Sequence, residues 1–392
     1  MEERIALMRA YDSGAFGVSE LCREYGISRE TFYVWKRRRE SGEERWFEDL
    51  SRAPGSCPHA VDACVVAAIL KVRRRFPSYG PKKIKARLAM DRPGIDWPAA
   101  STIGDILKRA GLIEAKPRRR KPLDRGEIVA GADQPNGEWA MDFKGWFRTA
   151  DGTRVDPLTV SDTASRYLVE VRITPPTHDG VKTILTRVFR DVGLPDAIRS
   201  DNGSPFGSTG AGGLSRIAVW LLKLGIEPRY IPPSSPQDNG RHERMHRTMK
   251  AETAKPPARC WEEQQYRFNV FRRLYNEERP HEALGQTTPS SHWRPPQRAM
   301  PVKIDEPWYD ADHEVRRVRP DGTIKWRGEH VFIGEALAGE PVGIAEHERG
   351  GHLVRYCGRD LGLIDHAGRF HRFAPPRARL RSAAKPAKMK PQ

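Results

Sequence analysis

The chain has 392 residues, with 68 Lys and Arg against 51 Asp and Glu, so its formal net charge is +17 at pH 7. At about 150 residues per domain, this length predicts two to three folded units. The mean hydropathy is −0.68, and the chain has no apolar run of about 18 residues, which excludes a membrane-spanning helix.

The start of the chain is acidic and has no apolar stretch, so we expect no signal peptide. The five cysteines are scattered and form no CxxC pair, which predicts a reducing, cytoplasmic location rather than a disulfide framework. The large positive charge predicts a polyanionic partner, with nucleic acid favoured over a membrane surface.

Residues 1–52 are predicted to form short helices. Gly26 ends one helix, and Ser28 is placed to cap the next, which is strongly basic. A helix, a glycine turn and a basic helix are typical of a helix-turn-helix domain. The alternative is a helical hairpin with a solvated charged face. In the DNA-binding interpretation, the predicted contacts from the third helix are Arg29, Glu30, Tyr33, Lys36 and Arg37.

Residues 58–115 are predicted to form a second helical domain. Helices are expected at 61–76, 81–89 and 101–110, and their basic edges indicate a second helix-turn-helix or a winged helix. Residues 116–135 then form a basic linker.

Residues 136–295 are predicted to form an α/β core with a sheet of mixed direction. Strands come first as a meander and then alternate with helices. Strands are expected at 138–143, 158–160, 167–173, 196–200 and 226–231, and helices at 181–192, 214–224, 239–252 and 261–275.

Residues 310–374 consist of short strand patterns separated by turn signals, which predicts a small β-barrel. Asp321-Gly322 predicts a hairpin between strands 315–318 and 323–326. Residues 375–392 are basic with no acidic residue and are predicted to be a disordered tail.

Three acidic residues of the core are candidates for catalysis. Asp142 lies on the first strand, Asp201 follows a short strand and precedes an Asn-Gly turn, and Glu243 lies one turn into a helix. Carboxylates that converge repel one another unless a cation lies between them. Oxygen ligands suit Mg²⁺ or Mn²⁺, and two such ions can promote displacement at a phosphodiester.

The segments WAMDF around Asp142, SDNGSPF around Asp201 and PQDNGRHERMHRTMK around Glu243 resemble the catalytic blocks of retroviral-integrase-like DDE transposases. The segment YNEERPH at 275–281 resembles the end of the core in bacterial insertion-sequence transposases. The resemblance covers about residues 136–295. It departs from the compact retroviral pattern in its longer interval between Asp201 and Glu243, which a Gly-rich insertion at 207–213 accommodates.

This resemblance implies a ribonuclease H-like core in which Asp142, Asp201 and Glu243 are both the catalytic residues and the ligands of two divalent ions. The implied activity is cleavage of element ends and strand transfer. The implied partners are double-stranded DNA, as terminal inverted repeats and target, and further copies of the chain in a homo-oligomer. Two alternatives remain: a ribonuclease H-type nuclease that does not join DNA, and a DNA-binding regulator with an inactive core.

The helix around Glu243 also contains a literal HExxH sequence, the signature of zinc proteases. Basic neighbours disfavour a closed zinc site, and no third ligand is evident nearby. Helical spacing predicts that Glu243, His246, Arg247 and Lys250 share one face and that His242 points elsewhere. Arg244, Arg247 and Lys250 are the predicted DNA contacts of this helix.

Four further residues are assigned structural roles. We expect Asp162 to form a turn and Asp238 to cap a helix. Trp139 and Trp146 are expected in the core rather than stacked on bases.

Overall fold

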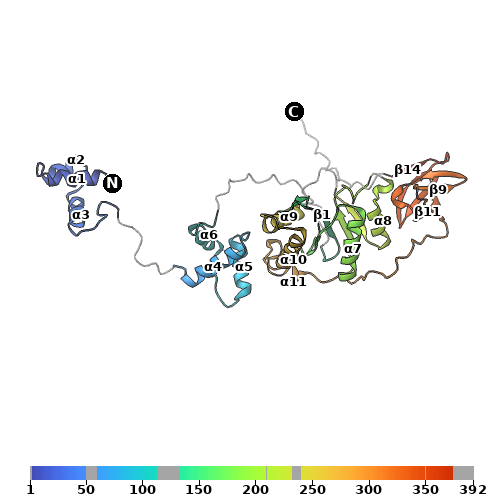
Figure 1. Ribbon diagram of the computed structural model, residues 1–392, viewed down its shortest axis with the longest axis horizontal. Helices are drawn as coiled ribbons and strands as arrows, with labels where there is room; N and C mark the ends of the chain where they lie inside the picture. Colours follow the sequence, from blue (N-terminus) through green and yellow to red (C-terminus); the bar gives the residue numbers. More distant parts are fainter. Residues whose placement is uncertain are drawn as a thin grey trace, which may run out of the picture. The chain divides into compact units, whose positions relative to one another are not determined.

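The computed structural model describes residues 2–49, 60–113, 133–208, 210–231, 240–348 and 350–373, except for the side chain of Arg241. The chain divides into two compact units, Met1–Asp62 and Ala63–Gln392 (Figure 1). The predicted tail at 375–392, most of the predicted linker at 116–135, and Asp238 lie outside the described residues. Among the described helices, none is both long and apolar enough to cross a membrane.

The first unit contains three helices, as predicted. Gly26 turns the chain with a φ of 63°, and the Ser28 side chain accepts a hydrogen bond from Thr31 N, which caps the third helix. Leu21 and Phe32 are buried at their junction. The helices are α1 (Glu2–Asp12), α2 (Val18–Glu24) and α3 (Arg29–Glu40).

The second unit begins with three more helices, again close to the predicted bounds. Ile69, Ile84 and Ile103 are fully buried between them. Residues 60–113 form no strand, so the winged-helix alternative lacks a wing in this segment. The helices are α4 (Ala63–Arg75), α5 (Pro81–Asp91) and α6 (Ala100–Arg109).

A mixed five-stranded sheet forms the centre of the α/β core, which confirms the predicted mixed direction. Its order is β5-β4-β1-β6-β7. The β1–β4 and β4–β5 pairs are antiparallel, and the β1–β6 and β6–β7 pairs are parallel. The strands are β1 (Trp139–Phe143), β4 (Pro157–Asp162), β5 (Leu168–Ile173), β6 (Ala197–Ser200) and β7 (Glu227–Tyr230), with a separate hairpin of β2 (Phe147–Arg148) and β3 (Arg154–Val155).

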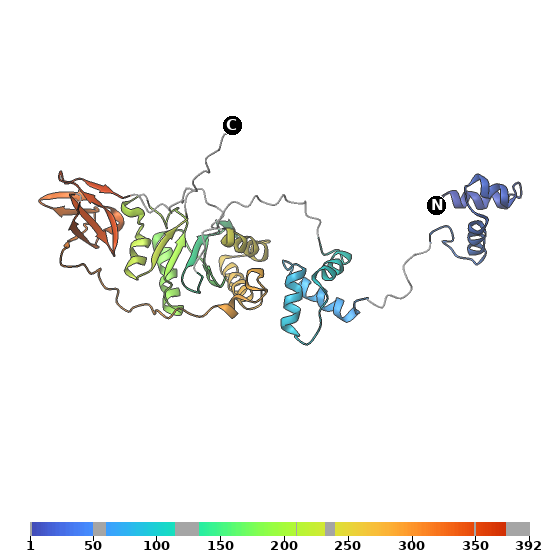
Figure 2. The same ribbon diagram turned by 180° about the vertical axis from the view of Figure 1, so that it is seen from behind.

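Helices cover both faces of this sheet (Figures 1 and 2). On one face, α7 (His178–Val192) and α8 (Arg216–Lys223) enclose a core that contains Trp139 and Phe189. On the other face, α9 (Gly240–Thr253) and α10 (Trp261–Glu277) pack on β5. The remaining short helical turns are η1 (Ala211–Gly213), which precedes α8, and η3 (Glu282–Leu284), α11 (Pro289–His292) and η4 (Glu335–Leu337).

The C-terminal region is β-rich, but the predicted small barrel is not confirmed, because its described strands form no closed sheet. Five antiparallel strands form an open sheet in the order β14-β13-β12-β11-β8, beside a β9–β10 hairpin. Residues of α8 share the hydrophobic core of this region, so α8 closes a face that a barrel would close with strands. The strands are β8 (Glu314–Arg317), β9 (Thr323–Trp326), β10 (Glu329–Phe332), β11 (Pro341–Glu346), β12 (His352–Tyr356), β13 (Arg359–Ile364) and β14 (Phe370–Arg372).

The predicted hairpin at Asp321-Gly322 is wrong. Gly322 does lie in a turn, and its N–H donates to Arg319 O at 2.9 Å. The strand before this turn, β8, pairs with β11. Instead β9 pairs with β10 across Arg327 and Gly328, whose φ angles of 48° and 94° suit a two-residue hairpin turn.

The two tryptophans assigned to the core differ. Trp139 is fully buried, as expected. Trp146 is 57% exposed, and the guanidinium groups of Arg148 and Arg154 lie 5.9 and 5.1 Å from its ring centroid. The expectation for Trp146 is therefore wrong: the small β2–β3 hairpin leaves this ring outside the core, beside Arg148 and Arg154.

Candidate active site

Two of the three predicted acids lie at the carboxyl ends of neighbouring parallel strands. Asp142 is the fourth residue of β1, and Asp201 directly follows β6. The β1–β6 pairing aligns Trp139 with Ile198 and Ala140 with Arg199. The same register, continued by two residues, brings Asp142 level with Asp201. Asp142 is half-buried and Asp201 is exposed.

The turn after Asp201 is anchored at both ends. Gly203 N donates to Asp201 Oδ1 at 3.2 Å, and Asn202 Nδ2 donates to Ile231 O at 2.7 Å. The predicted Asn-Gly turn therefore holds the Asp201 carboxylate at the sheet edge, between the ends of β6 and β7.

Helix α9 separates its charged and its buried residues onto two sides. Glu243 and the predicted DNA contacts Arg244, Arg247 and Lys250 are exposed, whereas His242 and His246 are 4% and 5% exposed. The prediction that His246 shares the face of Glu243 while His242 points elsewhere is wrong. The two histidines are four residues apart, which puts them on one face, and their ring centroids are 4.6 Å apart.

A single hydroxyl joins this buried face of α9 to the sheet. Thr159 on β4 lies directly opposite Asp142 on β1, and its Oγ1 donates to Asp142 O at 2.9 Å. The same oxygen lies 2.6 Å from His242 Nε2 and 2.7 Å from His246 Nε2. Because a threonine has one hydroxyl proton and two lone pairs, both imidazoles donate to it through Nε2–H.

Both imidazoles are neutral at physiological pH. Burial, reinforced by the nearby charge of Arg199, lowers the pKa of His242 to about 3. Burial, with smaller contributions from His242 and Lys144, lowers the pKa of His246 to about 2. Ser161 Oγ lies 3.2 Å from His242 Nδ1, so it donates to that nitrogen and completes the hydrogen bonding of His242.

The geometry brings together a different group from the predicted trio. Asp142, His242 and His246 offer ligand atoms within 4.8 Å of one another. Asp142, Asp201 and Glu243 do not form such a group among the described residues. Sequence reasoning missed Thr159 and Ser161, because only the β1–β4 register puts these hydroxyls beneath α9.

Asp162, the acid assigned a structural role, has that role here. It is 1% exposed, and its carboxylate accepts hydrogen bonds from Asn136 N and Ser165 N, each at 2.7 Å. These bonds close the turn after β4, so Asp162 is not available as a fourth catalytic acid.

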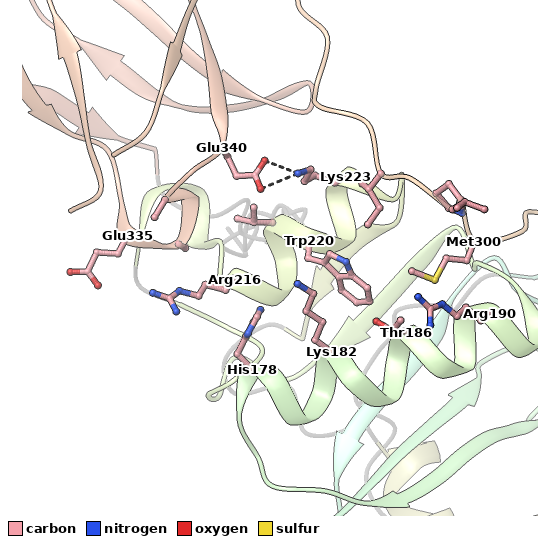
Figure 3. Close-up of a pocket in the computed structure, with 16 residues that line it drawn as sticks. His178, Lys182, Thr186, Arg190, Arg216, Trp220, Lys223, Met300, Glu335 and Glu340 are labelled. Carbon is pink, nitrogen blue, oxygen red and sulfur yellow. Dashed lines mark hydrogen bonds and ion pairs between the residues drawn. The ribbon is translucent and has the colours of Figure 1, made fainter. Parts of the chain in front are cut away.

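A basic groove lies between α7, α8 and the C-terminal region (Figure 3). It joins two cavities of about 810 and 870 Å³, which share His178, Arg216, Glu335 and Ala336. The second cavity reaches the loop after Asp201 at Ser204 and Pro205. The basic groove therefore runs from the neighbourhood of Asp201 along two helices.

Three cations of the basic groove have no acidic partner among the described residues. On α7, Lys182 and Arg190 are two turns apart on the side that lines the groove, and Arg216 begins α8 opposite them. By contrast, Lys223 is paired with Glu340 at 3.1 Å, the pair drawn with dashed lines in Figure 3.

The predicted DNA contacts of α3 are mostly exposed. Arg29, Glu30, Tyr33 and Arg37 all face solvent. Lys36 is half-buried and donates to the Tyr11 hydroxyl at 2.9 Å. Lys36 is thus held within the first unit, whereas the other four form an exposed surface on the helix.

The neutral histidines predict a loss of stability in acid. Unfolded histidines bind a proton below about pH 6.5, whereas His242 and His246 stay neutral in the fold until about pH 3 and 2. The unfolded state therefore binds more protons between these limits, and the free energy of unfolding falls as pH drops, by up to about 1.4 kcal/mol per pH unit for each histidine. Urea unfolding at pH 7.5 and 5.0 measures this slope.

The double variant His242→Gln/His246→Gln should be less stable but should have a shallower pH slope. Some slope should remain, because burial also lowers the pKa of His281 to about 3. The exposed His330 provides the matched substitution control, as His330→Gln. An unaltered slope in the double variant would contradict the assignment.

Comparison with protein families accounts for most of the chain. The model "Integrase core domain" matches residues 132–236, and a second model of the same description matches residues 224–289. "Helix-turn-helix domain" matches residues 3–54, and "IS481 family transposase, C-terminal domain" matches residues 313–369.

The chain is also similar to individual proteins. An insertion element IS476 protein of Xanthomonas euvesicatoria is 23% identical, over 74% of this chain and 75% of its own length. An insertion element IS407 protein of Burkholderia multivorans is 27% identical, over 47% of this chain and 65% of its own. The HTLV-2 integrase catalytic core domain in complex with magnesium is 17% identical with a TM-score of 0.33, over 41% of this chain and 97% of that one. The chain belongs to the transposase and integrase family, with an integrase core behind a helix-turn-helix DNA-binding domain.

Proposed function

We propose that this chain is a DDE transposase, whose ribonuclease H-like core cleaves the ends of a mobile element and joins them to target DNA. The observation that supports this most is the alignment of Asp142 and Asp201 at the ends of adjacent parallel strands. The helix that carries Glu243, α9, is bonded through Thr159 to the strand of Asp142. In this proposal the three acids are the catalytic residues.

The donor set fits divalent cations. Asp142, Asp201 and Glu243 offer carboxylate oxygens, which suit Mg²⁺ or Mn²⁺, and the two buried imidazoles add no positive charge because they are neutral. We propose that the three acids hold two such ions. When bound, two divalent ions activate the attacking oxygen and stabilise the leaving oxygen of a phosphodiester.

The exposed side of α9 orients the substrate. Arg244, Arg247 and Lys250 lie within two turns of Glu243 and face solvent with it, so they can neutralise phosphates of the strand to be cut. Water attacks the phosphorus first, the P–O3′ bond breaks, and the products are a 3′-hydroxyl and a 5′-phosphate. That hydroxyl then attacks a target phosphodiester and displaces the target's own 3′-oxygen as the leaving group. Positioning and charge supply most of the rate enhancement.

The other parts of the chain supply recognition. The exposed α3 surface of Arg29, Glu30, Tyr33 and Arg37 is proposed to contact the terminal repeats in the major groove. Because two DNA ends must be held at once, we propose a homo-oligomer that acts on double-stranded DNA in the bacterial cytoplasm.

The basic groove is proposed to hold DNA that continues past the active site. Its unpaired cations Lys182, Arg190 and Arg216 follow the groove away from the loop after Asp201. Eight residues of α-helix span about 12 Å, so Lys182 and Arg190 can contact separate phosphates. These contacts carry no base information and would act on any DNA sequence.

Neutralising any of the three acids should abolish the reaction without preventing DNA binding. We expect Asp142→Asn, Asp201→Asn and Glu243→Gln each to lower Mg²⁺-dependent cleavage of the element's own ends by more than about 100-fold, since even outer-shell changes at metal sites cost 10–100-fold. Labelled end fragments and a plasmid target measure cleavage and joining together.

The same assay separates the alternatives. Joined product that requires all three acids supports the transposase. Cleaved ends without joined product would favour the nuclease, and binding without any Mg²⁺-dependent cleavage by the wild type would favour the regulator. Asp162→Asn serves as the acid control: in the fraction that folds, cleavage should persist.

Removing two cations from the basic groove should weaken DNA binding in a salt-dependent manner. For Lys182→Gln/Arg216→Gln, the slope of log K against log salt should fall in magnitude by about 1.8, since each phosphate contact contributes about 0.9. The control is Arg273→Gln, an exposed cation of α10 on the opposite side of the sheet. Equal slopes for the double variant and the wild type would contradict the proposed DNA path.

A further inference from the structure

One nitrogen of the buried histidine pair forms no hydrogen bond to any of the described residues. His246 donates through Nε2–H to Thr159, because the hydroxyl proton of Thr159 is committed to Asp142 O. Its Nδ1 therefore carries a lone pair. This nitrogen makes no hydrogen bond within the part of the chain that the structure describes, and it faces Asp142 Oδ2 at 3.9 Å.

A lone pair and a carboxylate oxygen that face each other can both act as ligands of one cation placed between them. The two atoms are 3.9 Å apart. With bonds of about 2.1 Å, ligand atoms lie about 3.0 Å apart in adjacent octahedral positions and about 4.2 Å apart in opposite ones, so this separation comes nearest to that of two opposite ligands. The side chain of Asp142 is 18% exposed, so a cation can reach this point from solvent.

From this geometry we infer that His246 Nδ1 is a metal ligand, and that His246 and Asp142 bind one divalent cation together. This inference rests on the proposed metal-dependent function and extends it, because it adds an imidazole nitrogen to the carboxylate ligands of the metal site. Imidazole is a softer ligand than carboxylate, so it should favour Mn²⁺ over Mg²⁺ at this position.

His242 provides an internal comparison. It lies on the same face of α9, is equally buried and donates to the same Thr159 oxygen at 2.6 Å. Its Nδ1, however, accepts a hydrogen bond from Ser161 Oγ. His242 therefore has both nitrogens satisfied and serves only to position the helix.

The same contacts argue against the zinc-protease interpretation of HExxH. In that motif both histidines bind one zinc ion and the intervening glutamate acts beside it. Here both Nε2 atoms converge on the hydroxyl oxygen of Thr159 instead. Glu243 is exposed, away from the buried imidazoles.

The test is Mn²⁺ binding by the full-length protein, followed by electron paramagnetic resonance, with spin-echo modulation to detect coupling to an imidazole nitrogen. The informative variant is His246→Gln, because a glutamine amide can still donate to Thr159 but has no nitrogen lone pair. The matched control is His242→Gln. Circular dichroism checks that both variants fold.

We expect nitrogen coupling in the wild type and in His242→Gln, and its loss in His246→Gln together with at least about 10-fold weaker Mn²⁺ binding. Mg²⁺ affinity, measured by competition, should change less. Retained coupling and affinity in His246→Gln would overturn the inference, and loss of coupling in both variants would indicate a two-histidine site and overturn it too.

Asp142→Asn separates this inference from the proposed function. If Mn²⁺ binding requires Asp142 but not His246, the inference fails and the acidic metal site stands. If Asp142→Asn binds Mn²⁺ as the wild type does, the proposed metal site itself fails.

Discussion

The hydroxyl of Thr159 is the contact on which the geometry of the site depends. It donates to the backbone of β1 and accepts from two imidazoles of α9, so one oxygen joins two strands to a helix. Without it, two buried N–H groups would lose their acceptor, at about 1–3 kcal/mol each. Because Glu243 lies between the two histidines in sequence, this junction also determines where the third acid stands relative to Asp142.

A second junction holds the far end of the core, and it involves the segment YNEERPH at 275–281. In YNEERPH, Asn276 bonds both the N–H and the C=O of Leu168 at 2.8 and 2.9 Å, which fixes α10 on β5. Arg279 pairs with Glu252 of α9 at 3.1 Å and donates to Ser78 at 3.0 Å. Asn276 and Arg279 of this motif thus join α10 to β5, to α9 and to the loop between α4 and α5, and their role is structural.

Sequence reasoning located most strands and helices of the core and both strand-end acids, because alternation and turn residues are local signals. It did not predict features that depend on which strands and helices pack together. Asp321-Gly322 does turn the chain, but strand pairing there is decided by β11, which lies later in the sequence. The barrel was predicted from short strands and turn signals, which do not show that α8 contributes Ala218 and Val219 to that core. The roles of Thr159 and Ser161 follow from the β1–β4 register, which no local pattern specifies.

The distribution of charge on α9 explains how a strongly basic protein can keep an acidic site usable. Arg244, Arg247 and Lys250 are all exposed, where water screens their charge and phosphates can reach them. The groups packed nearest Asp142 on that helix are imidazoles, which burial keeps uncharged. A protonated imidazole at 3.9 Å would compete with a divalent cation for the same carboxylate, whereas a neutral one offers its lone pair. In the proposed metal site, burial of His246 therefore does more than pack the helix, because a neutral imidazole would be a ligand of the cation instead of a competitor for Asp142.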